Sequence, residues 1–328
     1  MTLESLNVPK NCLLITVDFD SLYTRIPIGE AIQCIKELFQ KYPIPQADLI
    51  IALLNSILYL NVIEFNGDFY LQISGLGMGT SLAPTLANIF VGWLEMQHNI
   101  PTDPKAILCS RLIDDILVIW NGDMKSAKAF TKRIGTMRTS LTIKEKISTI
   151  EIDYLDLHIY KGQRFIDQSI LDLKVYQKPT NLYLYVAFDS DIPQHVKKGI
   201  IKTELIRYCR ICSNELSFEE IKSFFYSRLR DRGYPIEFLD HEFQKVKYKD
   251  RTLYLQPSNK ESDKCIFFKV MFDSRIDKLN LSKLFRECND DAFCQQFCKD
   301  TLQVPPKICY KKGKSLTKML VKAKCNPV

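Results

Sequence analysis

Two adjacent aspartates, Asp114 and Asp115, stand between two strongly apolar runs, residues 106–113 and 116–120. Two such runs separated by only two residues predict a β-hairpin whose tip carries both carboxylates. That tip is poor for stability, because like charges repel and Asn-Gly or Asp-Gly would turn the chain better. A divalent cation would remove the repulsion, and Mg²⁺ prefers carboxylates and substrate phosphates as ligands. Taken alone, the pair also fits a solvent-exposed acidic turn.

The first apolar run of the chain also ends in acidic residues. Residues 13–20 (LLITVDFD) are apolar and β-branched, which predicts a buried strand with Asp18 and Asp20 at its end. If this strand lies beside the hairpin, Asp18 comes within reach of Asp114, and the cluster would hold two metal ions. Asp20 is the competing ligand. By itself, Asp18 also fits a strand-end acid that caps the amides of the following turn.

A glycine-rich loop, residues 75–81 (GLGMGTS), runs directly into a predicted helix. Pro84 stands in the first turn of that helix, where a missing N–H is tolerated. The glycines allow the backbone to approach another group closely, and the N-terminal amides of a helix favour phosphate. The pattern also fits a simple tight turn before a helix. Just before the loop, apolar runs flank Asn66-Gly67-Asp68 and predict a β-hairpin over residues 61–74.

The character of the chain changes near residue 180. Residues 1–180 mix strand and helix patterns, whereas the following part carries helical patterns at 196–213 and 218–230. A capping box, Ser217 to Glu220, predicts the start of the second of these helices. Residues 301–328 contain seven lysines and no acidic residue, and they account for the net charge of +7. Such a segment indicates either a phosphate-rich partner or a solvated tail.

Composition places the protein among ordinary globular chains. Of its 328 residues, 46% are apolar, so a sizeable hydrophobic core is expected. No apolar run reaches the roughly 18 residues of a transmembrane helix, and the start lacks the pattern of a signal peptide. We therefore expect an intracellular protein of the nucleus or cytoplasm, not secreted and not membrane-bound. The cysteines favour buried thiols over a zinc site, because the four that invite a zinc interpretation are irregularly spaced: Cys288, Cys294, Cys298 and Cys309.

Five segments follow one another in a specific order along the chain. They are VDFDSLYTRIP (17–27), YLQISGLGMGTSLAPTLANIF (70–90), RLIDDILVIW (111–120), YLDLHIY (154–160) and VYQKPT (175–180). In this order they resemble the reverse transcriptases of the Penelope-like retroelement family. The segments KKGIIKTELIRYCRICS (197–213) and RGYP (232–235) resemble the thumb of that family, and residues 311–324 resemble the end of its core. The resemblance covers most of the chain.

The resemblance implies an α+β fold in three parts. A polymerase palm, an antiparallel sheet backed by helices, would occupy residues 1–180, a helical thumb 181–300 and a basic C-terminal segment 301–328. By the same resemblance the catalytic residues are Asp18, Asp114 and Asp115, which with Phe19 are also the metal-binding residues. The implied nucleotide-binding residues are Phe19, Tyr23, Gln72 and Gly79. The implied nucleic-acid-binding residues are Lys178, Lys197, Lys198, Arg207 and Arg210.

The activity that the resemblance implies is RNA-directed DNA synthesis. A primer 3′-hydroxyl would attack the α-phosphate of a dNTP with two Mg²⁺ ions at Asp18 and Asp114, Mn²⁺ being the alternative metal. The partners are then an RNA template, a DNA primer and dNTPs. Tyr23 would pack under the sugar of the nucleotide and exclude a 2′-hydroxyl by its volume. A core tyrosine is the other interpretation of that residue.

Three features depart from the pattern of the family. Leu112 stands where the family has an aromatic residue, and the GIY and YIG motifs of a nuclease domain are not found. The sequence starts only seventeen residues before Asp18, whereas a family member has a fingers region upstream. Either a separate chain supplies the fingers or an upstream coding segment was cut away, and the sequence does not choose between them. Two alternatives therefore stay open. One is a catalytically inactive, nucleic-acid-binding remnant of a retroelement, and the other is a different palm-type nucleotidyl transferase or cyclase.

Overall fold

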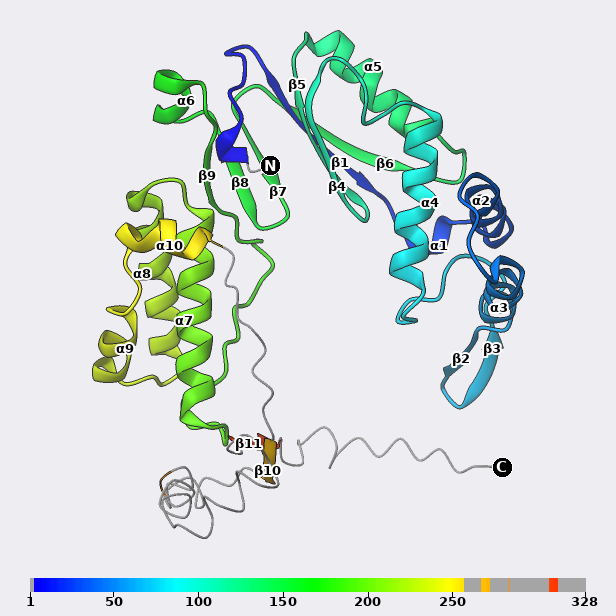
Figure 1. Ribbon diagram of the computed structural model, residues 1–328. Helices are drawn as coiled ribbons and strands as arrows, with labels where there is room; N and C mark the ends of the chain where they lie inside the picture. The colour runs from blue at the N-terminus through cyan, green and yellow to red at the C-terminus, as the bar shows by residue number, and fades with distance from the viewer. Residues whose placement is uncertain (1–2, 257–266, 272–282, 284–306, 312–328) are drawn as a thin grey trace, which may run out of the picture. The chain divides into compact units, whose positions relative to one another are not determined.

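The computed structural model describes residues 3–256, 267–271, 283 and 307–311 (Figure 1). Its contacts divide the chain into two compact units, Met1–Lys178 and Pro179–Val328. None of the helices in these described ranges has the length and apolar character needed to cross a bilayer. Of the expected basic segment 301–328, only residues 307–311 lie within the described ranges.

A four-stranded antiparallel sheet forms the centre of the first unit. Its strand order is β4 (Ala106–Leu112), β5 (Asp115–Trp120), β1 (Leu13–Phe19) and β6 (Ile143–Ser148). The central strand β1 is buried on both faces, which is why its sequence is almost continuously apolar instead of alternating. The hairpin between β4 and β5, expected from the sequence, is therefore present and lies beside β1, also as expected.

Helices cover one face of this sheet. They are α2 (Ile28–Lys41), α4 (Ala83–Gln97) and α5 (Met124–Gly135). Alternate residues of the two central strands, such as Val17 of β1 and Val118 of β5, pack into one core with apolar residues of these helices. Figure 1 shows α4 and α5 running along the sheet. The period of two in the strands and of about 3.6 in the helices directs these side chains into the shared core.

A second, three-stranded sheet packs against the other face. It consists of β7 (Glu151–Tyr154), β8 (Leu157–Tyr160) and β9 (Asp172–Val175), all antiparallel. The intervening residues of the central strands, Leu14 and Leu117, share a separate core with Ile152 and Ile159 of this sheet. The short helix α6 (Gln163–Gln168) connects β8 to β9.

The remaining elements of the first unit are a 3₁₀ turn (Leu3–Ser5), the short helix α1 (Leu22–Arg25), α3 (Ala47–Tyr59) and the hairpin β2 (Val62–Phe65) to β3 (Asp68–Leu71). The hairpin expected from Asn66-Gly67 is confirmed. Its two turn residues have φ angles of 54° and 90°, the left-handed conformation that these residue types tolerate.

The second unit is mainly helical in its described part. It contains α7 (Gln194–Ile211), α8 (Glu215–Asp231), α9 (Ile236–Phe243), a 3₁₀ turn (Tyr248–Asp250), α10 (Arg251–Leu255) and a parallel strand pair, β10 (Phe267–Met271) with β11 (Lys307–Lys311). The start predicted for α8 was late: the side chain of Asn214 accepts the Ser217 amide at 2.9 Å and caps the helix instead. The predicted α+β class, an antiparallel sheet backed by helices and then a helical unit, is confirmed.

Candidate active site

The strand register places Asp18 directly opposite Asp115. Asp18 of β1 pairs with Asp115 of β5 on one side and with Lys144 of β6 on the other, both in antiparallel register. The amide of Phe19 donates to the carbonyl of Asp114 at 3.1 Å, so the end of β1 is bound to the hairpin tip. The structure thus brings Asp18 close to Asp114 and Asp115, which follow it by 96 and 97 residues along the chain.

The hairpin tip is shifted by one residue from the position expected from the sequence. We expected both aspartates at the tip, but the two turn residues are Ile113 and Asp114, and Asp115 is the first residue of β5. Asp115 pairs with Leu112 on one side and with Asp18 on the other. The shift requires a left-handed backbone at Ile113, with φ of 56°, which is unfavourable for a β-branched residue.

Burial and mutual repulsion disfavour the ionised forms of these acids. The pKa of Asp18 is raised, first by burial and then by the charge of Asp114, although Lys144 and Lys178 act in the opposite direction. The pKa of Asp115 is raised by burial and by the charges of Asp114 and Asp18. A cation between them would stabilise the ionised carboxylates.

The donors present match Mg²⁺ in their chemistry. Within the described ranges, no group of three or more His, Cys, Asp or Glu side chains converges into a ready metal cage. Mg²⁺ is usually held by one or two carboxylates together with substrate phosphates and water, not by an all-protein cage. Asp18 and Asp115, opposite each other at a strand end, with Asp114 beside them, fit that mode of binding.

Asp20, the competing ligand, has other partners. Its carboxylate accepts Lys144 Nζ at 2.8 Å and Arg25 Nη2 at 3.4 Å. The Lys144 hydrogen bond and charge lower the pKa of Asp20. Two cations therefore already compensate its charge, and Asp18 is the better candidate for the metal.

The glycine loop contacts the segment that carries Tyr23. The amide of Leu76 donates to the carbonyl of Tyr23 at 2.7 Å. A Cβ added to Gly75, whose φ is 75°, would lie 2.7 Å from the backbone of Thr24, so glycine is required for this close approach. Gly79 also has a positive φ, 92°, but the space around it is open. Tyr23 itself is half-buried and packs against the core.

Two predicted nucleotide-binding residues are engaged within the protein. The side chain of Phe19 is 2% exposed and belongs to the core, so only its backbone is in a position to contact a ligand. The side-chain amide of Gln72 accepts Asn61 Nδ2 at 2.6 Å and donates to the Ser74 carbonyl at 2.8 Å. These two bonds hold Gln72 against the base of the glycine loop.

The predicted nucleic-acid-binding residues differ in exposure. Lys178, at the end of the first unit, is exposed. In the second unit, Lys197 is only 4% exposed, and its ammonium donates to the carbonyls of Phe188 and Ser190 at 2.6 and 2.9 Å. Lys197 is therefore the least accessible of the five predicted phosphate contacts.

The other three predicted residues of this group lie on α7. Lys198 and Arg210 are exposed, and Arg210 Nε donates to the Tyr254 carbonyl at 2.5 Å. Arg207 is partly buried and pairs with Glu204 at 2.7 Å. Lys198 and Arg210 therefore present their charge more openly than Arg207.

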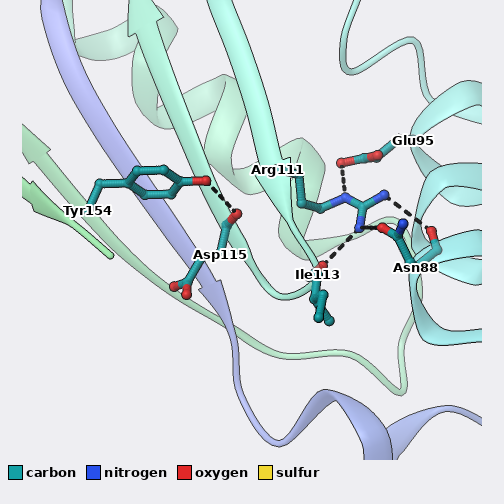
Figure 2. Close-up of polar contacts among 6 residues, drawn as sticks. All are labelled: Asn88, Glu95, Arg111, Ile113, Asp115 and Tyr154. Atoms are coloured by element: carbon teal, nitrogen blue, oxygen red, sulfur yellow. Dashed lines mark hydrogen bonds and ion pairs between the residues drawn. The ribbon is translucent and has the colours of Figure 1, made fainter. Parts of the chain in front are cut away.

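Sequence reasoning missed two residues that hold the hairpin tip. Figure 2 shows Arg111 between α4 and the Ile113 carbonyl, and Tyr154 of β7 donating to the Asp115 carbonyl at 3.3 Å. The signal for Arg111 was its charge inside an otherwise apolar strand segment, because a charge at such a position requires a partner. No comparable signal marked Tyr154, whose partner is a backbone atom.

Comparison with known proteins gives one family match and a set of structural likenesses. A model described as "Animal helix-turn-helix domain" matches residues 184–244, which include α7, α8 and α9. No curated protein matches the sequence. Among solved structures, telomerase from Candida albicans with a TWJ fragment of telomeric RNA aligns at a TM-score of 0.47 and 13% identity over 76% of this chain.

Two further solved structures also align with the chain. The RNA-dependent RNA polymerase of a human picobirnavirus aligns at a TM-score of 0.45 and 12% identity over 74% of this chain. Apo telomerase from Candida tropicalis, truncated from its C-terminal domain, aligns at a TM-score of 0.39 and 15% identity over 50% of this chain. The chain spans 46%, 48% and 35% of the lengths of these three proteins, respectively.

Proposed function

We propose that the chain carries the active site of a template-directed nucleic-acid polymerase that transfers nucleotides onto a primer 3′-hydroxyl. The observation that carries this proposal is the pairing of Asp18 with Asp115 at the end of the central strands, with Asp114 bound to the Phe19 amide beside them. Carboxylates whose ionised forms are disfavoured by one another are a feature of functional sites more often than of structural ones.

The protein side of the reaction follows from the described residues. Asp18, Asp114 and Asp115 would hold Mg²⁺, which supplies charge stabilisation for the attacking and leaving oxygens of an in-line displacement. The loop at residues 75–81 leads into the N-terminus of α4, a favourable location for the phosphates of the incoming nucleotide. Tyr23, whose carbonyl accepts the Leu76 amide of this loop, would contact the sugar of that nucleotide.

We further propose that the polymer made is DNA and the template RNA, as in the Penelope-like reverse transcriptases that the ordered motifs resemble. The support for this finer assignment is the sequence resemblance together with Tyr23, whose ring would exclude a 2′-hydroxyl. Among the exposed cations, we assign Lys178 in the first unit, and Lys198 and Arg210 in the second, to contacts with nucleic-acid phosphates, each unit taken by itself. Such an enzyme would act in the nucleus or the cytoplasm.

Primer extension tests the proposal directly. The purified chain is mixed with a primer annealed to an RNA template, Mg²⁺ and dNTPs, and it is compared with the Asp114→Asn/Asp115→Asn variant. We expect extension by the first protein and none by the second, because two of the three carboxylates are then neutral. Reactions with a DNA template, and with ribonucleotides, determine which polymer is copied and which is made.

The outcome that would contradict the proposal is equally specific. If neither protein extends the primer while both bind the primer–template with the same dependence on salt, the chain is not a polymerase by itself. It is then either a nucleic-acid-binding remnant or one part of a split enzyme that needs a partner. Extension that persists in the double variant would show that the carboxylate cluster is not the active site.

A further inference from the structure

The guanidinium of Arg111 joins three parts of the first unit. Its Nε donates to Glu95 Oε1 at 2.8 Å, and its Nη1 donates to Asn88 Oδ1 at 2.7 Å and to the carbonyl of Ile113 at 2.9 Å. Nη2 donates to the carbonyl of Asn88 at 3.3 Å. Two of the partners belong to α4 and the third is the first residue of the hairpin turn (Figure 2).

The side chain of Arg111 packs against one face of α4. Asn88, Gly92 and Glu95 are spaced by four and three residues, so they share one face of the helix. A Cβ at Gly92 would lie 3.4 Å from Nη2 of Arg111, so a longer side chain there would displace the guanidinium. The side chains of Arg111 and Glu95 are only 11% and 9% exposed, and each charge therefore depends on the other.

The hydrogen bond from Arg111 to the Ile113 carbonyl is made at a residue whose backbone conformation is unfavourable. Ile113 has the left-handed φ of 56° that moves Asp115 into β5 and opposite Asp18. An isoleucine keeps such a conformation only where its surroundings hold it. Arg111 of β4 connects this turn to α4, the helix that begins directly after the glycine loop.

We propose that Arg111 is a positioning residue that fixes the Ile113–Asp114 turn to α4 and so holds the carboxylates in their metal-binding arrangement. The metal part of this inference rests on the proposed function. Lysine is no substitute for arginine here. Its single ammonium is able to pair with Glu95, but it lacks the planar fork of donors that reaches Asn88 and Ile113 at the same time.

The test measures metal binding and tip mobility separately from catalysis. Mn²⁺ affinity is measured by electron paramagnetic resonance without nucleic acid or nucleotide, and hydrogen exchange is measured at the Phe19 amide, which donates to the Asp114 carbonyl. The variants are Arg111→Lys, Asn88→Ala and Asn88→Asp. The matched control is Arg133→Lys, because Arg133 also forms an ion pair, with Asp103 at 2.6 Å, but does not contact the tip.

For Arg111→Lys we expect Mn²⁺ affinity to fall by about 10- to 100-fold, the usual effect of losing a residue that orients metal ligands, and exchange at Phe19 to accelerate. Asn88→Ala, which leaves the buried ion pair in place, should show the same changes to a smaller degree. Asn88→Asp keeps an acceptor oxygen and should restore affinity. Arg133→Lys should match the original protein in both readouts.

Unchanged Mn²⁺ affinity and unchanged exchange in folded Arg111→Lys and Asn88→Ala would overturn the inference. Absence of Mn²⁺ binding in the unaltered protein, both alone and with a primer–template and a dNTP that supplies phosphate ligands, would instead refute the proposed metal site. In that case the exchange data alone decide whether Arg111 fixes the turn.

Discussion

Replacing Gly75 by alanine tests whether the glycine loop is held in place by a close backbone contact. Gly75 has φ of 75°, and an added Cβ would lie 2.7 Å from both Cα and the carbonyl oxygen of Thr24. The atoms in the way belong to the backbone, so no side-chain rotation relieves the overlap. The loop must therefore move away from α1, and the bond between the buried Leu76 amide and the Tyr23 carbonyl is lost.

The expected cost has two parts. The left-handed conformation costs alanine about 1–2 kcal/mol relative to glycine. Loss of a buried backbone hydrogen bond adds about 1–3 kcal/mol. The sum is about 2–5 kcal/mol for Gly75→Ala. Gly79→Ala is the matched control, because its φ is 92° but nothing lies within 4 Å of the added Cβ. It should lose only the conformational part, about 1–2 kcal/mol.

Urea unfolding of both variants, followed by the fluorescence of the first unit's buried Trp120, gives the free energies of unfolding. We expect Gly75→Ala to be less stable than Gly79→Ala by about 1–3 kcal/mol. In a unit of this size that difference lowers the melting temperature by roughly 2–12 °C. Equal destabilisation of the two variants would refute the reasoning, since positive φ alone would then account for both glycines.

Three other predictions use the same structure. The pKa values of Asp18 and Asp115 are raised in the fold, so protons compete with the metal at pH values above the ordinary carboxyl range. Calorimetry should therefore show that Mn²⁺ affinity falls as the pH drops through the raised pKa values. Over the same pH range, protonation of these two groups should raise the free energy of unfolding of the metal-free protein. A pH-independent affinity between pH 7 and about 4 would contradict this. Tyr23→Ala should raise incorporation of ribonucleotides relative to deoxyribonucleotides in primer extension, and an unchanged ratio would remove Tyr23 from the sugar contact. Lys197→Ala removes two hydrogen bonds to backbone carbonyls, so it should lower the melting temperature without changing the salt dependence of nucleic-acid binding. Lys198→Ala should weaken nucleic-acid binding and leave the melting temperature unchanged. The reverse pattern would show that Lys197 is the phosphate contact.

The elements that position the site were largely predictable from the sequence. The apolar runs at residues 13–20 and 106–120 predicted strands, and Asn66-Gly67 predicted a hairpin, because side-chain period and turn chemistry are local properties. The proximity of Asp18 to the hairpin aspartates also followed, once the first strand was assumed to lie beside the hairpin. The strand and hairpin predictions depended only on side-chain period and turn chemistry, whereas this proximity depended on which strands pair.

The register of the tip required the tertiary structure. Local rules placed both aspartates in the turn, whereas the structure places Ile113 and Asp114 there. The difference arises because the pairing of β5 with β1 moves Asp115 into the strand, and because Arg111, through α4, supports the left-handed Ile113. None of these contacts is visible in the sequence of the hairpin alone.

By itself, the sequence determined the strands, the helices and the residues able to supply a carboxylate cluster, because residue spacing carries this information. Only the tertiary structure decided which of the candidate acids and lysines already have partners within the protein. Asp20 is compensated by Lys144 and Arg25, and Lys197 is bound to carbonyls of a preceding segment. The physical reason is that the availability of a charge depends on its partners and its burial, and both are set by residues distant in the chain.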